Sequence, residues 1–237
     1  MKFFHIDWLP QTRWGYRLVK RFHDSPDPEL KDRFKQYWPT EQMIAFETKL
    51  ALIRVIQRRF NEDVAKLSEE LGNKVAEIQR CIPEHKALRL ADSDLAFRLV
   101  AGIDAFIFEA RSAYEILGTV VRQIADNILG IKVDEKALRE ILEAKGRDTR
   151  WIDDLRDERI TFFHQTAPWF AVEVTENDPP YEILVLRRNA YDLESDVSAA
   201  FPLAMLNRIF FGFDGAVGVI EEWLLEGIDQ AQKGAAS

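Results

Sequence analysis

The residues best suited to chemistry lie in one short stretch, Trp151–Trp169, with the sequence WIDDLRDERITFFHQTAPW. Read at 3.6 residues per turn, Arg159 falls on a helical stripe that otherwise carries apolar side chains such as Phe162. A guanidinium that faces a protein core needs a carboxylate or a phosphate as its partner. His164 follows about 140° further round the helix, and Asp157 lies on the same face as His164. The stretch therefore predicts a small polar site instead of a single salt bridge.

A second line of charged residues is expected on the long helix that precedes this stretch. That helix is predicted from about Asp92 to Gly130, with capping oxygens and negative charge at its start. Beside its apolar stripe, Asp104, Arg111 and Glu115 recur at helical spacing. The carboxylates of this line are natural partners for Arg159. Two interpretations stay open: an interhelical ion pair that only fixes the register, or the charged border of a functional cleft.

The rest of the pattern predicts a mainly α-helical fold, a bundle of long antiparallel helices with one small β-hairpin. Amphipathic spacing and capping residues predict further helices over Thr40–Pro83 with a kink near Gly72–Asn73, over Lys132–Lys145 with Asp134 as cap, and from Ser195 or Asp196 onwards with Pro202 in an early turn. Two β-rich runs, residues 169–174 and 181–186, flank a turn that contains two prolines. This hairpin is expected to pack on the helices, since a lone hairpin is only marginally stable.

The whole chain, residues 1–237, is predicted to be a single domain. Residues 1–40 are rich in aromatic residues and proline and are predicted to be an irregular N-terminal extension, with a possible strand at Arg13–Phe22. Residues 41–230 are predicted to form the bundle, with the hairpin at about residues 169–188. The tail that follows, from residue 230 to residue 237, is predicted to be disordered.

Three glycines in the last predicted helix, Gly212, Gly215 and Gly218, are spaced GxxGxxG. No strand precedes them, so they do not match the GxGxxG motif of dinucleotide-binding folds. They predict close packing against another helix or local flexibility.

The composition sets limits on location and partners. The net charge of −8 argues against a broad surface for duplex DNA, because such binding depends on neutralising phosphates with Lys and Arg. The chain has no apolar run long enough to cross a membrane, and charge interrupts its first residues too early for a signal peptide. The single cysteine, Cys81, fits a reducing compartment. A soluble, cytoplasmic protein without a membrane partner is therefore expected.

No cofactor and no metal ion are predicted. His5 and His23 lack the nearby carboxylates or cysteines of a metal site, and Cys81 has no CxxC partner. A helical-bundle metalloenzyme would need ExxH pairs on facing helices, and the sequence contains none.

A helix that ends in Arg-x4-His, after a long helix with charged residues along its inner edge, resembles the HEPN superfamily. The resemblance covers roughly Asp92 to Pro168, with the last helix as a further member of the bundle. In that family an Rx4-6H motif marks metal-independent ribonucleases and related toxins, which are commonly dimers with a composite site. The resemblance therefore implies a metal-independent ribonuclease or a toxin- or defence-related RNA-binding protein, with RNA as partner and a homodimer as the assembly.

RNA cleavage at these residues would be chemically coherent. It requires a group that moves protons near neutral pH, which suits His164 as the acid/base. It also requires permanent positive charge on the phosphoryl oxygens, which suits Arg159 as a phosphate clamp. Glu115 and Asp157 would orient these two groups.

A non-catalytic helical interaction or scaffold protein is the competing interpretation. In that case Arg159 would be neutralised by Asp104, Glu109 or Glu115. His164 would then only complement the dipole at the C-terminal end of its helix.

Overall fold

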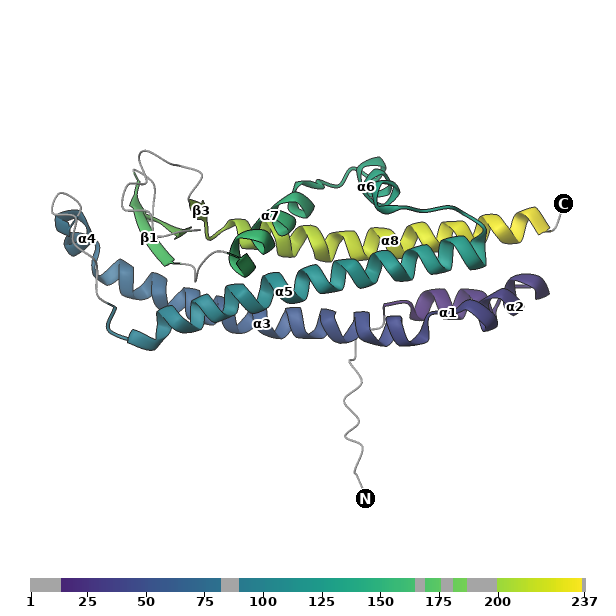
Figure 1. Ribbon diagram of the computed structural model, residues 1–237, viewed down its shortest axis with the longest axis horizontal. Coiled ribbons are helices and arrows are strands. Elements are labelled where there is room, and N and C mark those ends of the chain that lie inside the picture. The colour runs from purple at the N-terminus through teal and green to yellow at the C-terminus, as the bar shows by residue number, and fades with distance from the viewer. Residues whose placement is uncertain (1–13, 82–89, 165–168, 176–180, 187–199, 236–237) are drawn as a thin grey trace, which may run out of the picture. The chain divides into compact units, whose positions relative to one another are not determined.

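The computed structural model describes residues 14–81, 90–164, 169–175, 181–186 and 200–235 (Figure 1). Its helices are α1 (Tyr16–His23), α2 (Pro28–Tyr37), α3 (Thr40–Asn73), α4 (Val75–Cys81), α5 (Ser93–Gln123), the π-helix η2 (Ile124–Leu129), α6 (Glu135–Ala144), α7 (Arg150–His164) and α8 (Met205–Ala235). Its strands are β1 (Trp169–Val174), β2 (Tyr181–Leu186) and β3 (Ala200–Pro202).

These elements make a mainly α-helical protein with a small antiparallel sheet, which confirms the predicted fold class. The hairpin of β1 and β2 pairs in register from Trp169 opposite Leu186 to Val174 opposite Tyr181, as its two β-rich runs predict. The sheet also contains β3, which pairs with β2 and was not predicted. A strand of three residues is too short to show the alternation that identifies longer strands.

Contacts divide the chain into two compact units. The first unit consists of Met1–Ile53, Glu109–Trp151 and Phe211–Ser237, and the second consists of Arg54–Phe108 and Ile152–Phe210. Helices α3, α5 and α8 each contribute residues to both units. The single domain predicted from the sequence stays a prediction.

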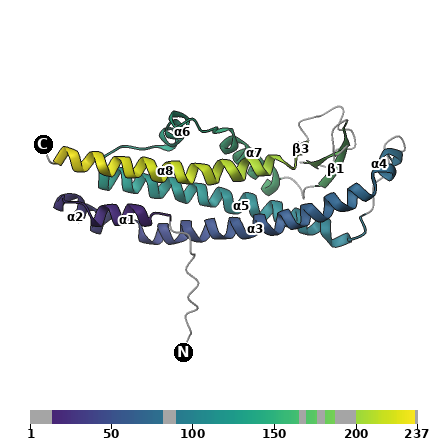
Figure 2. The ribbon, with the colours of Figure 1, turned by 180° about the vertical axis from the view of Figure 1, so that it is seen from behind.

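In the first unit, the segment that leads into α1 is fixed to α8. The Trp14 Nε1–H donates to the Val217 carbonyl at 3.0 Å, and the Gly15 N–H donates to the Glu221 carboxylate at 3.1 Å. Trp14 also packs edge-to-face on Phe46 of α3, with ring centroids 4.8 Å apart. Figure 2 shows α1 at the same end of the protein as the C-terminal half of α8. The Glu221 side chain thus caps α1, which has no side-chain cap of its own.

A tryptophan and a glycine form a close helix contact in the first unit. Trp151, at the start of α7, is only 1% exposed and packs edge-to-face on Tyr114 and Phe213, at 5.6 and 5.8 Å between centroids. A Cβ added at Gly212 of α8 would lie 2.3 Å from the indole Cδ1. The close packing predicted for the three glycines therefore occurs at Gly212. At Gly218 a Cβ would meet nothing within 4 Å.

The core of the second unit lies where α3, α4, α5 and the sheet meet. Its buried residues are Leu67, Leu71, Ile78, Leu95 and Leu99, and Phe60, Val64, Leu90, Phe170, Val172, Tyr181 and Ile183 pack against them. One face of the β1–β2 hairpin therefore covers α3, and the Tyr181 hydroxyl fixes it by donating to the Ser68 carbonyl at 2.9 Å. Gly102 of α5 lets the Phe60 ring approach closely, because a Cβ there would lie 2.9 Å from it.

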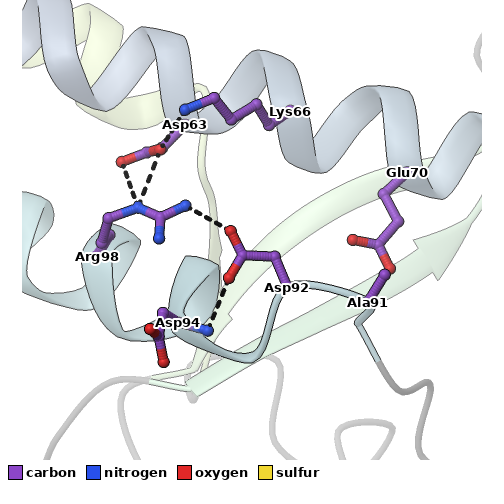
Figure 3. A network of polar contacts seen from close by, with 7 residues as sticks. All are labelled: Asp63, Lys66, Glu70, Ala91, Asp92, Asp94 and Arg98. Atoms are coloured by element: carbon purple, nitrogen blue, oxygen red, sulfur yellow. Dashed lines mark hydrogen bonds and ion pairs between the residues drawn. The ribbon is translucent and has the colours of Figure 1, made fainter.

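A polar network holds the start of α5 to α3 within the second unit (Figure 3). Arg98 lies at its centre, with Nε 3.2 Å from an Asp63 oxygen and Nη2 2.9 Å from an Asp92 oxygen. The other oxygen of Asp92 accepts from the Asp94 N–H at 3.0 Å and so caps α5. The side chains of Arg98 and Asp92 are about half exposed, so the network sets the helix register more than it adds stability.

Most predicted helix boundaries in the middle of the chain are confirmed. The break between α3 and α4 falls at Lys74, next to the predicted kink. Asp134 caps α6 by accepting from the Ala137 N–H at 2.7 Å. The long helix predicted to Gly130 ends there, with Gly130 at a φ of 73°, although its last turn is the wider η2.

The interpretation of residues 1–40 as irregular, with a strand at Arg13–Phe22, is wrong for the described residues. They form α1 and α2 instead. Leu18 and Phe22 are buried at the four-residue spacing of a helix, while Tyr16, which a strand would place on the same face as Leu18, is 60% exposed. Pro28 starts α2 behind the capping Asp27, so this proline marks a helix start and not a loop.

The predicted start and end of the last helix are also wrong. Residues 195 and 196 lie outside the described residues, but residues 200–202 form β3 and α8 begins only at Met205. Pro202 thus lies at the end of an edge strand, where its missing N–H costs nothing. The tail predicted to be disordered is helical up to Ala235.

Candidate functional site

Helix α7 carries the two predicted catalytic residues. It runs without a break from Arg150 to His164, so Arg159 and His164 lie on one helix, as predicted. In the second unit, Ile152 and Leu155 are buried, which places the first part of the predicted apolar stripe in a core. The Arg208 guanidinium lies 2.6 Å from the Asp154 carboxylate and holds α7 to α8 within this unit.

The side chains of residues 158–164 lie outside the described part of the structure. The predicted inward position of Arg159 and the predicted polar site around His164 therefore stay predictions. Helix geometry still relates the two residues: they are about 7.5 Å apart along the axis and about 140° apart around it. Two positions so placed on one helix do not share a face.

The four supporting residues fall in two groups. Arg111 and Glu115 lie in the first unit, where Arg111 Nε donates to Glu115 Oε1 at 2.8 Å and its guanidinium lies 5.8 Å from the Tyr114 ring centroid. Asp104 and Asp157 lie in the second unit and are exposed. Asp157 is 3.4 Å from Arg156 on its own helix. The structure thus brings Arg111 and Glu115 together.

Glu109, which the competing interpretation offers as a partner for Arg159, has a different cation beside it. Lys49 Nζ of α3 lies 2.6 Å from Glu109 Oε2, and both side chains are largely buried. Lys49 and Glu109 are therefore close enough to form an ion pair, although Glu109 Oε2 accepts no hydrogen bond from the described residues. Because partly buried charges are screened less than exposed ones, this pair holds α3 to α5 in the first unit.

A concave site that was not predicted from the sequence lies within the second unit. It is a cavity of about 250 Å³ between α3, the start of β2 and the start of α8. The aromatic residues Phe60 and Tyr181 form part of its wall, and the polar residues Asn61, Glu182 and Asn207 also line it. The cavity therefore combines aromatic surface with polar residues, of which Glu182 alternates along β2 with Tyr181 and Ile183 and so lies on the other face of the strand.

The aromatic wall of this cavity is fixed by its surroundings. The Phe60 ring packs on Gly102, and the Tyr181 hydroxyl is held by the Ser68 carbonyl. By contrast, the side chains of Asn61, Glu182 and Asn207 make no hydrogen bond or ion pair to the described residues. The aromatic part of the wall is thus held in place by contacts within the second unit.

The sequence carries only a weak signal for this cavity. Phe60, Val64 and Ser68 are spaced as one stripe of a helix, and such a stripe usually faces a core. Glu182 and Asn207 join it only through the packing of β2 and α8 on α3. No local pattern predicts that packing, because these segments are more than a hundred residues from α3.

The half-buried carboxylate of Glu47 on α3 provides a prediction about pH. Burial raises the pKa of Glu47 to about 7. The folded protein then holds this proton at pH values where the unfolded chain has lost it, so folding stability falls as the pH rises from about 4.5 to 7. Glu47→Gln should therefore leave stability unchanged near pH 4.5 and raise it by about 1 kcal/mol at pH 8, allowing for solvent screening.

Urea unfolding of both proteins at pH 4.5, 6 and 8 would measure this difference. The control is Glu62→Gln, which removes an exposed carboxylate from the same helix. A gain at pH 8 that is the same in both variants would show that net charge, not the burial of Glu47, is responsible.

Comparisons with known proteins give no relative: no family model, no curated protein and no solved structure matches the chain. Among the helices described, none is both long enough and apolar enough to span a bilayer. Within the same residues, no cluster of three or more His, Cys, Asp or Glu side chains is arranged to hold a metal ion.

Proposed function

We propose that this chain is a HEPN-like RNA-processing protein that cleaves RNA without a metal ion, with His164 and Arg159 as catalytic residues. The observation that carries the proposal is the unbroken course of α7 from Arg150 to His164, which gives the Arg-x4-His motif a helical setting. His164 acts as the acid/base at the 2′-hydroxyl and the leaving oxygen. Arg159 neutralises the phosphoryl oxygens in the transition state.

The proposal includes a homodimer. The positions of Arg159 and His164 lie about 140° apart around one helix, so we propose that a single phosphate is contacted by the arginine of one copy and the histidine of another. A twofold axis would create two such composite sites. Asp157, which is exposed about two turns before His164 on the same helix, is proposed to orient the histidine.

The test is cleavage of a mixed RNA pool in the presence of EDTA, with the chemistry of the new ends determined. The wild type is expected to leave 2′,3′-cyclic phosphate ends, and His164→Ala is expected to lower the rate by at least about 100-fold. Arg159→Ala is expected to lower it similarly, because one charge-stabilising group in a transition state typically contributes about 100- to 1,000-fold.

Matched controls are available within the chain. His23→Ala removes an exposed histidine from the first unit, and Arg156→Ala removes an exposed arginine from α7 itself. Both should cut like the wild type. RNA that stays intact with the wild type, or equal cleavage by the wild type and His164→Ala, would refute the catalytic proposal.

A second candidate function, a non-catalytic helical interaction protein, is supported by exposed aromatic side chains. Phe97 in the second unit is 74% exposed, and Phe211 in the first unit is 67% exposed. Large apolar groups at a surface are typical of binding faces when they form a patch. This function becomes the preferred one if the cleavage test is negative.

A further inference from the structure

We infer that the cavity of the second unit binds one base of a single-stranded RNA, and that the arginines preceding the cavity along α3 hold the neighbouring phosphate. This inference rests on the proposed function, since it names the surface that holds the RNA substrate. The residues that carry it are Arg54, Arg58, Phe60 and Tyr181, all of the second unit. They lie outside residues 92–168, where the resemblance to the HEPN superfamily falls.

The cavity has the size and the aromatic wall that a single base requires. Its volume of about 250 Å³ is below the roughly 300–1,000 Å³ of pockets for drug-sized molecules. Phe60 and Tyr181 both line it and are partly exposed. Proteins that bind single strands stack unpaired bases on such side chains, and they tolerate any sequence because every base has a π-face.

Contacts within the second unit hold the wall of the cavity in place. The Phe60 ring packs closely on α5, and the Tyr181 hydroxyl donates to the Ser68 carbonyl. On the third side, the Leu203 N–H donates to the Ile183 carbonyl at 2.9 Å and joins the start of the α8 segment to β2. A wall that is already ordered loses little entropy when a base enters.

Helix α3 places two arginines beside the cavity. Asn61 lines the cavity, and Arg58 lies about one turn before it, roughly 60° away around the helix axis. Arg54 lies about two turns before Asn61 and only about 20° away. Both arginines are exposed. A nucleotide carries its phosphate one sugar away from its base, so a base in the cavity leaves its phosphate at the rim, beside these positions.

The guanidinium of Arg58 is available for a phosphate. In the part of the chain that the structure describes, the Arg58 side chain forms no ion pair or hydrogen bond, although Glu62 follows it by four positions. An arginine presents a planar fork of donors that suits phosphate oxygens. Because each such contact releases counterions from the strand, it makes the affinity depend on salt.

The next residue of α3 provides a matched control for Arg58. Arg59 is also exposed, and its side chain likewise pairs with none of the described residues. Its position lies about 160° from that of Asn61 around α3, on the opposite side of the helix. Arg58→Gln and Arg59→Gln therefore change the net charge alike and differ in their position relative to the cavity.

Phe60 has a matched control in the same core. Phe60 and Phe170 both pack against the buried cluster that contains Leu67 and Leu71, but of these two rings only Phe60 lines the cavity. Phe60→Leu and Phe170→Leu thus each remove one ring from this core, and only the first removes aromatic surface from the cavity.

The experiment measures the binding of a fluorescein-labelled oligouridylate of about eight nucleotides, a length that one single-strand module can cover. The oligomer carries 2′-O-methyl groups, so it lacks the hydroxyl that attacks during cleavage and stays intact. Fluorescence anisotropy with the full chain gives Kd at several salt concentrations. A second oligomer, with the same backbone but without bases, separates the two parts of the site.

Arg58→Gln is expected to lower the slope of log Kd against log salt by about 0.7, the value for one phosphate contact on a single strand, and Arg59→Gln to leave it unchanged. Phe60→Leu should weaken oligouridylate binding at least about fivefold, because the stacking of one base is lost, and Phe170→Leu should not. With the oligomer that lacks bases, Phe60→Leu should bind like the wild type, whereas Arg58→Gln should still lower the slope.

Four results would overturn the inference: no binding of the oligouridylate, equal salt slopes for Arg58→Gln and Arg59→Gln, or an equal effect of Phe60→Leu and Phe170→Leu. The fourth is binding of free uridine monophosphate as tight as that of the oligomer, which would make the ligand a mononucleotide and not RNA.

Failure of the proposed function looks different. If the oligomer binds as expected but RNA is not cut, the RNA-binding cavity stands and the nuclease proposal fails. If RNA is cut in a His164-dependent manner and the Arg58 and Phe60 variants bind the oligomer like their controls, only the cavity site fails.

Discussion

Trp151→Ala is expected to lower the free energy of unfolding by about 4 kcal/mol, the range found when large aromatic side chains are removed from a core. The indole is almost fully buried and contacts the rings of Tyr114 and Phe213. It joins α7 to α5 and α8 within the first unit, so the resulting cavity would lie where three helices meet. Urea unfolding followed by circular dichroism would measure the loss.

Trp151→Phe is expected to cost much less. The indole Nε1–H is buried and has no hydrogen-bond partner among the described residues, so the tryptophan already carries an unpaired donor. Phenylalanine keeps most of the aromatic contact and removes that donor, whose burial without a partner costs about 1–3 kcal/mol.

Gly212→Ala tests the same contact from the side of α8. The new methyl group would lie 2.3 Å from the indole, so either α7 or the tryptophan must move, at a cost of about 1–3 kcal/mol. When Trp151 is already alanine, the methyl group added at position 212 has room. Gly212→Ala should then raise the free energy of unfolding by up to about 1 kcal/mol, because alanine has a higher helix propensity than glycine. Gly218→Ala, where nothing lies within 4 Å, is the control and should be stabilising. Additive effects of Trp151→Ala and Gly212→Ala would contradict this account.

Glu221→Ala is expected to cost about 3 kcal/mol. Its carboxylate accepts from the buried Gly15 N–H, and the Arg17 guanidinium lies 3.6 Å from its other oxygen. Removing the carboxylate leaves that donor without a partner at the positive end of α1. Glu221→Gln keeps an acceptor and should recover part of the loss. Urea unfolding would give the cost, and faster hydrogen exchange in α1 would locate it.

Glu222→Ala is the matched control for this substitution. Glu222 is the next residue of α8 and pairs with the same Arg17 at 2.6 Å, but both side chains are about half exposed. An exposed pair of this kind contributes less than about 1 kcal/mol. If Glu221→Ala and Glu222→Ala destabilise the protein equally, the carboxylate of Glu221 is not the cap of α1.

The parts of the fold that could be predicted are those with strong local signals. The hairpin was predicted with its bounds because its strands are rich in residues that favour β structure and its turn contains prolines, and α6 was predicted from its Asp134 cap. The errors at the N-terminal end arise from aromatic side chains. Tyr16 counts as apolar in a pattern, but it is exposed, and only the tertiary position of α1 on α8 distinguishes it from the buried Leu18 and Phe22.

In the candidate site, too, only the feature with a local sequence signal could be predicted. The Arg-x4-His motif could be placed on a helix from the sequence, because Arg159 and His164 belong to one continuous segment. The cavity could not, since its polar residues Asn61, Glu182 and Asn207 come from three elements far apart in the chain. These three residues also form no recognisable sequence motif. Their meeting depends on how β2 and α8 pack on α3, which is a property of the tertiary structure.

The capping of α1 by Glu221 has a consequence for the order of events during synthesis. Gly15 and Glu221 are separated by 206 positions, and translation proceeds at roughly 5–20 residues per second. The ribosome therefore completes α1 at least about ten seconds before its cap emerges. An eight-residue helix is not stable alone in water. The first unit therefore completes its folding only after translation of α8, and until then the apolar residues around Trp14 are exposed to aggregation.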